Sequence, residues 1–379
     1  MQAMDSAQSH LLQIAQRVRA AAADATPLRI RGGGTKDFHG LALQGELLDT
    51  RALAGVVSYE PSELVVTVRA GTPLAEVEAL LAAQGQCLPF EPPHFDGDSR
   101  NATVGGMVAS GLSGPSRASV GAVRDFVLGL EMINGQGELL RYGGQVMKNV
   151  AGYDVSRLMA GSWGALGLIT EVSLKVLPVA PAEATLRFAC SQQQALDWLN
   201  AWGGQPLPLN ASCWLQEDGA AQGVLYLRLR GARAAVQAAC ERLGGERMHS
   251  AAADWQACRE QQLPWFTARA PGHALWRLSV PQTAPALALP DGCTGPLIEW
   301  HGALRWVQAP RALGHALRAL AKAAGGSATL FRSEAADQPG AEPDFDAQAA
   351  DATAALHARL KQAFDPAGIF NRGRLAAAW

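Results

Sequence analysis

The chain has 379 residues, of which 48% are hydrophobic and 17% are charged, and its formal net charge at pH 7 is −2. This length suits two or three domains, each with its own core. The near-neutral charge argues against a nucleic-acid-binding protein and against an acidic disordered tail. Glycine is unevenly distributed, because 15 of the 40 glycines lie between Gly97 and Gly167.

The first 25 residues contain Asp5 and Asp24 and no long apolar run, and their apolar residues recur every three or four positions. This spacing predicts an amphipathic helix rather than a secretory signal or a membrane span. No window of about 18 residues is uniformly apolar, so we expect a cytoplasmic protein with at most peripheral contact to the inner face of the cell membrane. The six cysteines show no metal-ligand spacing, which is typical of reduced, buried thiols.

Short strands and one helix are predicted next. Residues 28–31 favour a strand that runs into a glycine-rich loop. Further strands are expected at residues 47–50, 56–59 and 64–70. Thr72 is expected to cap a helix over residues 73–84, with Pro73 at its first position.

The glycine-rich part of the chain predicts one short helix, at residues 103–110, and three strands, at 123–133, 138–142 and 166–176. After Pro178 the composition changes, and nine of the ten tryptophans lie beyond residue 190. Strands and helices alternate there in two similar copies, which favours an α+β domain with one antiparallel sheet covered by helices. A polar linker over residues 334–346 and a final helix over about 347–364 complete the expected organisation, with boundaries near 180 and 340.

Residues 31–35 read RGGGT. Three consecutive glycines after a strand allow backbone N–H groups to converge on an anion, because no Cβ blocks close approach. The motif is neither a G-x-G-x-x-G dinucleotide fingerprint nor a P-loop. An ordinary flexible turn is the alternative interpretation.

The second glycine cluster follows Thr103. Gly105 and Gly106 open the predicted short helix, so free N–H groups and the positive end of the helix dipole would face a ligand. The polar and small residues that would line the same path are Ser110, Gly114, Arg117 and Arg124. The two arginines can neutralise phosphate or form local ion pairs instead.

The third cluster spans residues 148–170, with Gly161, Gly164 and Gly167 at a spacing of three. This spacing suits either close packing of a loop or a surface for a flat ligand. The stretch AGSWG around Ser162 lacks the first glycine of a nucleophile elbow, which disfavours a serine hydrolase. Three such loops separated by strands predict a large ligand with a diphosphate and a planar ring.

This array resembles the FAD-binding domain of the vanillyl-alcohol oxidase and p-cresol methylhydroxylase (PCMH) superfamily. The matching pieces, over residues 27–178 and 362–374, include RGGGT, ATVGGMVASG, GSWGALGLITEVSLKVLP and the tail DPAGIFNRGR. The phrases EPPHFDGDSRNATVGGMVASGL, RYGGQVMKNVAGYDVSRLM and REQQLPWF are similar to the E-subunit family of bacterial glycolate dehydrogenase (glycolate oxidase). With these, the resemblance spans nearly the whole chain.

The resemblance implies an α+β fold with a two-subdomain PCMH-type FAD-binding domain (1–180), an α+β cap domain with an antiparallel sheet (181–340), and a C-terminal helix and tail that return to the FAD domain (341–379). The residues implied to hold FAD, beside Arg31 of the first loop, are Gly32, Gly33, Gly34, Thr35, Thr103, Gly105, Gly106, Ser110, Gly161, Gly164, Ile169, Asn371 and Arg374. Superfamily members with covalent flavin carry His where this chain has Thr35, and His39 is out of register. The FAD is therefore expected to be non-covalent.

Related D-2-hydroxy-acid dehydrogenases carry an H-x-G-D-G-N-x-H metal-and-base segment in the cap, which this chain lacks. Oxidation of a 2-hydroxy acid needs a base for the hydroxyl proton and a cation for the carboxylate. The cap offers His301 as the base and Arg277 or Arg305 as the carboxylate clamp. The alternative is a hydrogen-bonded histidine on a strand, and the spacing of the eight histidines argues against a metal site.

The resemblance thus implies an FAD-binding subunit of a glycolate (D-2-hydroxy-acid) dehydrogenase complex, which oxidises glycolate to glyoxylate. Its implied partners are a larger FAD-containing catalytic subunit and an iron–sulfur subunit. Two alternatives stay open: a catalytically silent assembly subunit, and a stand-alone FAD-dependent oxidoreductase acting on a sugar acid or lactone. The roles of Cys87 and of Trp163, which can stack on the flavin or pack on its own loop, also stay open.

Overall fold

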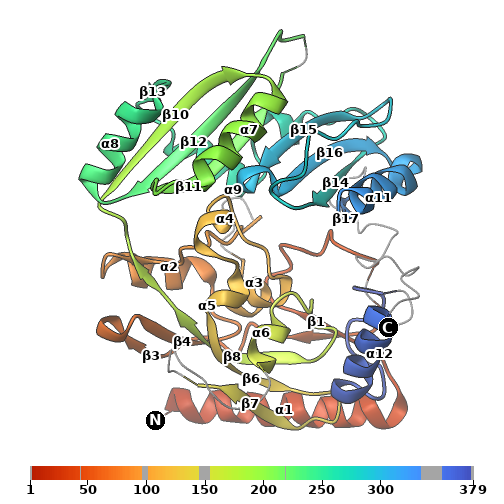
Figure 1. The fold of residues 1–379 in the computed structure, drawn as a ribbon. Helices are drawn as coiled ribbons and strands as arrows, with labels where there is room; N and C mark the ends of the chain where they lie inside the picture. The colour runs from red at the N-terminus through yellow and green to blue at the C-terminus, as the bar shows by residue number, and fades with distance from the viewer. Residues whose placement is uncertain are drawn as a thin grey trace. The chain divides into compact units, whose positions relative to one another are not determined.

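The computed structural model describes residues 2–42, 44–95, 101–144, 154–217, 219–333 and 352–376. Within these residues, no helix is both long enough and apolar enough to cross a membrane. The chain divides into two compact units (Figure 1). The first unit comprises Met1–Leu112, Ala122–Pro178 and Pro339–Trp379, and the second comprises Ser113–Gly121 and Val179–Gln338.

The first unit is built on a five-stranded antiparallel sheet in the order β3-β4-β8-β6-β7. Its strands are β3 (Val56–Glu60), β4 (Val65–Arg69), β6 (Val127–Ile133), β7 (Leu139–Gly143) and β8 (Leu168–Lys175). The inner strands β4 and β8 are almost entirely buried and rich in β-branched residues, which suits central positions. A separate short pair joins β5 (Gln86–Cys87) to β9 (Leu177–Pro178).

The two ends of the chain share one core in the first unit. Strands β1 (Leu28–Arg31) and β2 (Glu46–Asp49) pair in parallel. The N–H group of Leu28 donates to the carbonyl of Ile369 at 2.8 Å, so the C-terminal segment lies beside β1. The apolar face of the amphipathic helix α1 (Gln2–Asp24) packs on this group.

The other helices of the first unit are short. They are η1 (Pro61–Glu63), α2 (Leu74–Ala82), α3 (Val104–Ser110), α5 (Val123–Phe126), α6 (Val155–Met159) and α12 (Ala352–Phe364). Thr72 does not cap α2 as predicted, because its hydroxyl donates to the carbonyl of Arg69 at 2.7 Å, and the helix begins after Pro73. The first four residues of the strand predicted over 123–133 form α5 instead.

The second unit contains one eight-stranded antiparallel sheet in the order β13-β10-β12-β11-β15-β16-β14-β17. Its strands are β10 (Ala182–Cys190), β11 (Leu209–Leu215), β12 (Gly223–Gly231), β13 (Glu246–Met248), β14 (His273–Ser279), β15 (Thr294–Glu299), β16 (Leu304–Pro310) and β17 (Ser327–Arg332). The expected antiparallel sheet of an α+β domain is confirmed.

Helices cover this sheet in two groups. Helices α7 (Gln192–Gly203) and α8 (Arg233–Leu243) pack on β10, β11 and β12 through one apolar cluster, and α11 (Gly314–Ala323) packs on β14, β16 and β17 through another (Figure 1). The remaining helices are α4 (Arg117–Val120), α9 (Ala252–Arg259), α10 (Pro264–Thr267), η2 (Trp300–Gly302) and η3 (Arg311–Leu313).

The unit boundaries differ from the predicted ones in one respect. The chain changes unit after Pro178 and at Pro339, close to the predicted boundaries near 180 and 340, but Ser113–Gly121 also belongs to the second unit. This segment contains α4, and its place in the second unit was not predicted. The predicted linker over 334–346 and the residues 148–153 of the third glycine cluster lie outside the described residues.

Candidate functional site

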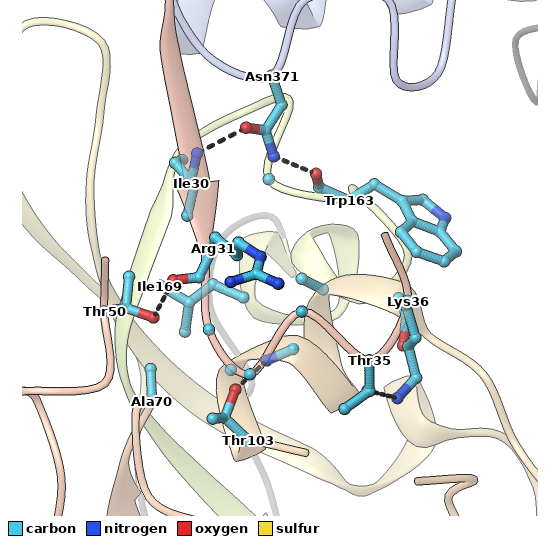
Figure 2. Close-up of a pocket in the computed structure, with 18 of the residues that line it drawn as sticks. Ile30, Arg31, Thr35, Lys36, Thr50, Ala70, Thr103, Trp163, Ile169 and Asn371 are labelled. Carbon is cyan, nitrogen blue, oxygen red and sulfur yellow. Dashed lines mark hydrogen bonds between the residues drawn. The ribbon is translucent and has the colours of Figure 1, made fainter. Parts of the chain in front are cut away.

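A pocket in the first unit brings together parts of the three glycine-rich loops and the C-terminal segment (Figure 2). The residues that line it are Ile30, Arg31, Gly32, Gly33, Gly34, Thr35, Lys36, Asp37, Thr50, Ala70, Thr103, Gly105, Gly106, Ala109, Ser110, Trp163, Gly164, Gly167, Ile169, Asn371 and Arg374. Most of the predicted FAD-binding residues are in this set.

The glycine loop after β1 presents open backbone N–H groups. Within the described residues, the N–H groups of Gly32, Gly33, Gly34 and Thr35 donate to no protein acceptor. Gly33 has no room for a side chain, because a Cβ there would overlap the carbonyl oxygen of Asn101, and Gly34 has a φ of +74°. Consecutive free N–H groups in such a loop form a nest that suits an anion.

Three cationic side chains line the same pocket. The Nε of Arg31 donates to the carboxylate of Asp37 at 2.6 Å, and the Nζ of Lys36 donates to the carbonyl of His94 at 3.2 Å. Arg374 is only 5% exposed, and burial lowers its pKa to about 10. Within the described residues its buried Nε has no hydrogen-bond partner. A buried cation with an unsatisfied donor fits a site that receives an anion.

The start of α3 does not present the free N–H groups that the sequence predicted. The N–H group of Gly105 donates to the carbonyl of Ala70 at 2.7 Å, and that of Gly106 donates to Oγ1 of Thr103 at 3.2 Å. Gly105 serves close packing, since a Cβ there would lie 2.7 Å from the Cβ of Ala70. That prediction is therefore wrong, and both glycines contribute to the pocket by their small size.

The side chain of Asn371 joins the third glycine loop to β1. Its Oδ1 accepts a hydrogen bond from the N–H group of Ile30, and its Nδ2 donates to the carbonyl of Trp163, both at 2.8 Å (Figure 2). Trp163 and Asn371 have φ values of +52° and +40°, which are strained for residues other than glycine. A Cβ on Gly164 would lie 2.6 Å from Nδ2 of Asn371. The loop and the C-terminal segment therefore hold each other in place as one wall.

The indole of Trp163 stacks on His39. The two ring centroids are 4.2 Å apart and the rings are inclined by 15°. The guanidinium of Arg374 lies 5.9 Å from the Trp163 ring, and its Nη1 donates to the carbonyl of His39. Trp163 thus packs on a neighbouring segment while it lines the pocket, whereas His39 is not a lining residue.

Gly161 and Arg124 lie outside the pocket. The N–H group of Gly161 donates to the carbonyl of Val108 at 3.1 Å, which ties the third loop to α3. The side chain of Arg124 is exposed, and its Nε lies 4.0 Å from the carboxylate of Asp125. These contacts agree with the local-ion-pair interpretation of Arg124.

Gly114 and Arg117 lie in the second unit, around the buried Trp300. The indole Nε1 of Trp300 donates to the carbonyl of Gly114 at 2.9 Å. The guanidinium carbon of Arg117 lies 4.3 Å from the centroid of the Trp300 ring, and that of Arg277 lies 5.3 Å from it. Two guanidinium groups are therefore held over one indole by cation–π contacts.

His301 is buried between two serines. Its Nδ1 lies 3.1 Å from Oγ of Ser212, its Nε2 lies 3.1 Å from Oγ of Ser119, and its N–H group donates to Oγ of Ser212 at 2.9 Å. Burial lowers the pKa of His301 to about 4, so the imidazole is neutral and weakly basic at pH 7. Trp300, His301 and Gly302 have φ values of +53°, +54° and +101°, a strained turn that its surroundings must enforce.

Arg305 is fully buried and bound to the backbone. It donates to the carbonyl oxygens of Gly302, Ala284 and Pro285 at 3.2, 2.6 and 2.5 Å. Burial lowers its pKa to about 10. These three bonds support a structural role for Arg305.

Sequence reasoning missed Lys36 and Asp37, although both line the pocket. Both residues directly follow RGGGT. Charged residues next to an expected anion-binding loop could therefore have been predicted to line the pocket. Thr50 and Ala70 carried no such signal, because each is an ordinary residue just after a strand that the fold brings to the pocket.

Comparisons with known proteins agree with this geometry. Residues 9–143 match the family model described as an FAD binding domain. The glycolate oxidase subunit GlcE of Escherichia coli (strain K12) is 46% identical over 363 residues, which cover 96% of each chain. The glycolate oxidase subunit GlcD of Bacillus subtilis (strain 168) is 30% identical over 162 residues, which cover 42% of this chain and 34% of the relative. The D-lactate dehydrogenase of Anaerostipes hadrus is 31% identical over 142 residues, or 38% of this chain and 29% of the relative.

Solved structures match over a longer stretch at low sequence identity. A structure of alkyldihydroxyacetonephosphate synthase has a TM-score of 0.62 and 14% identity, and the match covers 94% of this chain and 74% of that one. At this identity the match shows a shared fold, which includes both the FAD-binding half and the sheet of the second unit.

Proposed function

The chain belongs to the family of the glycolate oxidase subunit GlcE and contains an FAD-binding domain, and from this premise we propose that it is the FAD-binding subunit of a complex that oxidises glycolate or a related D-2-hydroxy acid. The observation that carries the proposal is the row of open N–H groups from Gly32 to Thr35, set beside buried Arg374. Such a nest suits the diphosphate of FAD.

The pocket residues fit FAD in two parts. Gly32, Gly33, Gly34 and Thr35 would hold the diphosphate, with Arg31 and Lys36 supplying positive charge. The wall of Trp163, Gly164, Ile169 and Asn371 would hold the flavin ring. When bound, FAD supplies the hydride acceptor for oxidation of the substrate alcohol. We propose that FAD is non-covalent, because no histidine lines the pocket among the described residues.

On the substrate side, we propose that Arg117 and Arg277 bind the carboxylate. Cation–π contacts with Trp300 hold both guanidinium groups in position. His301 would then act as a positioning residue, because its ring is held by Ser119 and Ser212 and its pKa of about 4 makes it a weak base at pH 7.

Few bases are found among the described residues that line the FAD pocket, which favours catalysis in a complex over catalysis by this chain alone. The carboxylate of Asp37 lines the FAD pocket, but it is paired with Arg31 at 2.6 Å. We therefore propose that a larger FAD-containing catalytic subunit and an iron–sulfur subunit complete the complex, at most peripherally bound to the inner face of the cell membrane. A catalytically silent assembly subunit is the second candidate, and the same observation favours it.

Two measurements test these proposals. The purified chain should show flavin absorbance near 370 and 450 nm, roughly as for any flavin, and apoprotein should regain it with added FAD. A preparation that stays colourless after reconstitution would refute FAD binding. Glycolate-dependent dye reduction should require the partner subunits, and a chain that reduces dye alone at the rate of the complex would refute the need for them.

The proposed carboxylate clamp has its own test. In the assembled complex, Arg277→Gln should raise the KM for glycolate about tenfold or more, because a charge-assisted hydrogen bond is lost. Arg305→Gln tests the structural role and should instead lower thermal stability. If Arg277→Gln leaves the KM unchanged, the clamp proposal fails.

A further inference from the structure

The second unit contains a cavity that the proposed function does not use. It has a volume of about 370 Å³, and its walls include Leu215 of β11, Trp255 of α9, Trp265 of α10 and the loop residue Leu263. Small-molecule sites are typically cavities of roughly this size with mostly apolar walls and a few polar groups.

The charged residues that line the cavity are acidic. Glu217 and Asp254 line it, both are exposed, and neither is ion-paired within the described residues. Among the described residues that line it, none is Lys, Arg or His. Arg228 lies 4.9 Å from the Trp255 ring, but it is buried and donates to Oδ1 of Asn210. A second cation, Arg187, bonds to the lining residue Tyr226 and is paired with Glu246 at 2.9 Å. The two lining carboxylates therefore favour a cationic ligand over a carboxylate.

The two tryptophans of the wall differ in their hydrogen bonding. The indole Nε1 of Trp265 is buried and has no acceptor within the described residues. Buried donors normally have a partner, but this atom has almost no accessible surface and therefore does not face the open cavity. The indole of Trp255 is already satisfied, because its Nε1 donates to Oγ1 of Thr185 at 2.9 Å.

We propose that this cavity binds a small arylalkylamine, that is, a primary amine joined to an aromatic ring by a short alkyl chain. The aromatic ring would pack against Trp255 and Trp265, and the ammonium group would face Glu217 and Asp254. This ligand class is opposite in charge to a 2-hydroxy acid, so the cavity is a second site and not the substrate site. The proposal rests on the second unit alone and does not depend on whether the chain binds FAD.

Three probes of nearly equal size test the proposal: tyramine, tyrosol and 4-hydroxyphenylacetate share one phenol ring and carry an ammonium, a hydroxyl and a carboxylate. Isothermal titration calorimetry is performed on the full chain as purified. Tyramine should bind most tightly, with an affinity at least about tenfold above that of 4-hydroxyphenylacetate, and tyrosol should fall between them. Equal binding of all three, tighter binding of the carboxylate, or no binding of tyramine at millimolar concentration would overturn the proposal.

Three variants test whether tyramine binds in this cavity. The double variant Glu217→Gln/Asp254→Asn changes only exposed side chains and should reduce the affinity for tyramine to that for tyrosol. Leu215→Trp fills the cavity and should abolish binding of both. Glu241→Gln, on the exposed face of α8, is the matched control and should change nothing. If Leu215→Trp does not fold, the double variant alone tests the proposal. Tyramine affinity that is unchanged in the double variant would refute it.

Discussion

At the scale of single residues, the pocket depends on a glycine, because a side chain at that position would not fit. Gly33 lies so close to the 101–103 loop that a Cβ would overlap the carbonyl oxygen of Asn101. Gly33→Ala should therefore displace the open N–H groups and weaken FAD binding by about tenfold or more. Titration of apoprotein with FAD, followed by flavin fluorescence, measures this.

The control for Gly33→Ala is Gly203→Ala, at the end of α7, where a Cβ meets no atom within 4 Å. It should leave the FAD affinity unchanged. Equal affinities for both variants and the parent protein would show that the RGGGT loop does not shape the site.

The neutral state of His301 predicts a pH dependence of stability. Its pKa is about 4 when folded and 6.5 when unfolded, so the unfolded state binds the proton more readily. Its stabilising contribution is complete above pH 6.5 and is lost progressively as the pH falls toward 4, by at most about 3 kcal/mol. Urea midpoints at pH 7.5 and 5 measure the effect.

The comparison for His301 is His301→Gln, which can still bond to Ser119 or Ser212 but does not titrate. The variant should lose less stability than the parent protein between pH 7.5 and 5. Parallel losses in the two proteins would contradict the buried, neutral state of the imidazole.

At the scale of elements, α12 supports the pocket through a hydrogen bond to the third glycine loop. The Nζ of its buried Lys361 donates to the carbonyl oxygens of Ala165 and Phe370 at 2.7 and 3.1 Å, and to the carboxylate of Asp365 at 2.7 Å. Lys361→Met removes this donor from the carbonyl oxygens of Ala165 and Phe370 and leaves the buried carboxylate of Asp365 without its cation, so the wall that holds Asn371 should loosen. We expect weaker FAD binding and faster proteolysis of the third loop.

Lys322 provides the control for this change, because it lies on the exposed face of α11 in the second unit. Lys322→Met removes the same charge from the chain. If both variants have the FAD affinity of the parent protein, Lys361 does not position the pocket.

The elements also show what the sequence could and could not predict. RGGGT and the glycine spacing of the third loop were located by local pattern, whereas the tail with Asn371 and Arg374 was implied only by the family resemblance. The structure brings all of them to one pocket. The satisfied N–H group of Gly105 was not predictable, because its acceptor is the carbonyl of Ala70, on another strand end. The hydrophobic periodicity of a sequence does not reveal hydrogen-bond partners that come from different elements.

At the scale of the whole molecule, each unit is discontinuous in sequence. The nine residues of Ser113–Gly121 are separated from the end of α3 by only two residues, yet they belong to the second unit, where Ser119 contacts His301. Composition changes near residue 180 predicted the main division. Nothing in the local pattern of Ser113–Gly121 distinguishes it from the glycine-rich loops on either side.

The discontinuity predicts the effect of a truncation. A chain that ends at residue 351 keeps every glycine loop but lacks α12, Asn371 and Arg374. It should fail to bind FAD, whereas a chain that ends at residue 376 should bind it normally. Absorbance at the flavin maximum after gel filtration with FAD measures this, and cofactor retention by the shorter chain would contradict the role of the C-terminal segment.

The pairing of β1 with the C-terminal segment also has a consequence for biosynthesis. Leu28 and Ile30 are made early, but their partners Ile369 and Asn371 follow 341 residues later in the chain. Many domains fold in order from the N-terminus as they emerge, whereas this flavin site can be completed only after the segment around Asn371 has left the ribosome. Loading of the cofactor is thereby delayed until that segment has been made, and a product terminated before it should remain colourless.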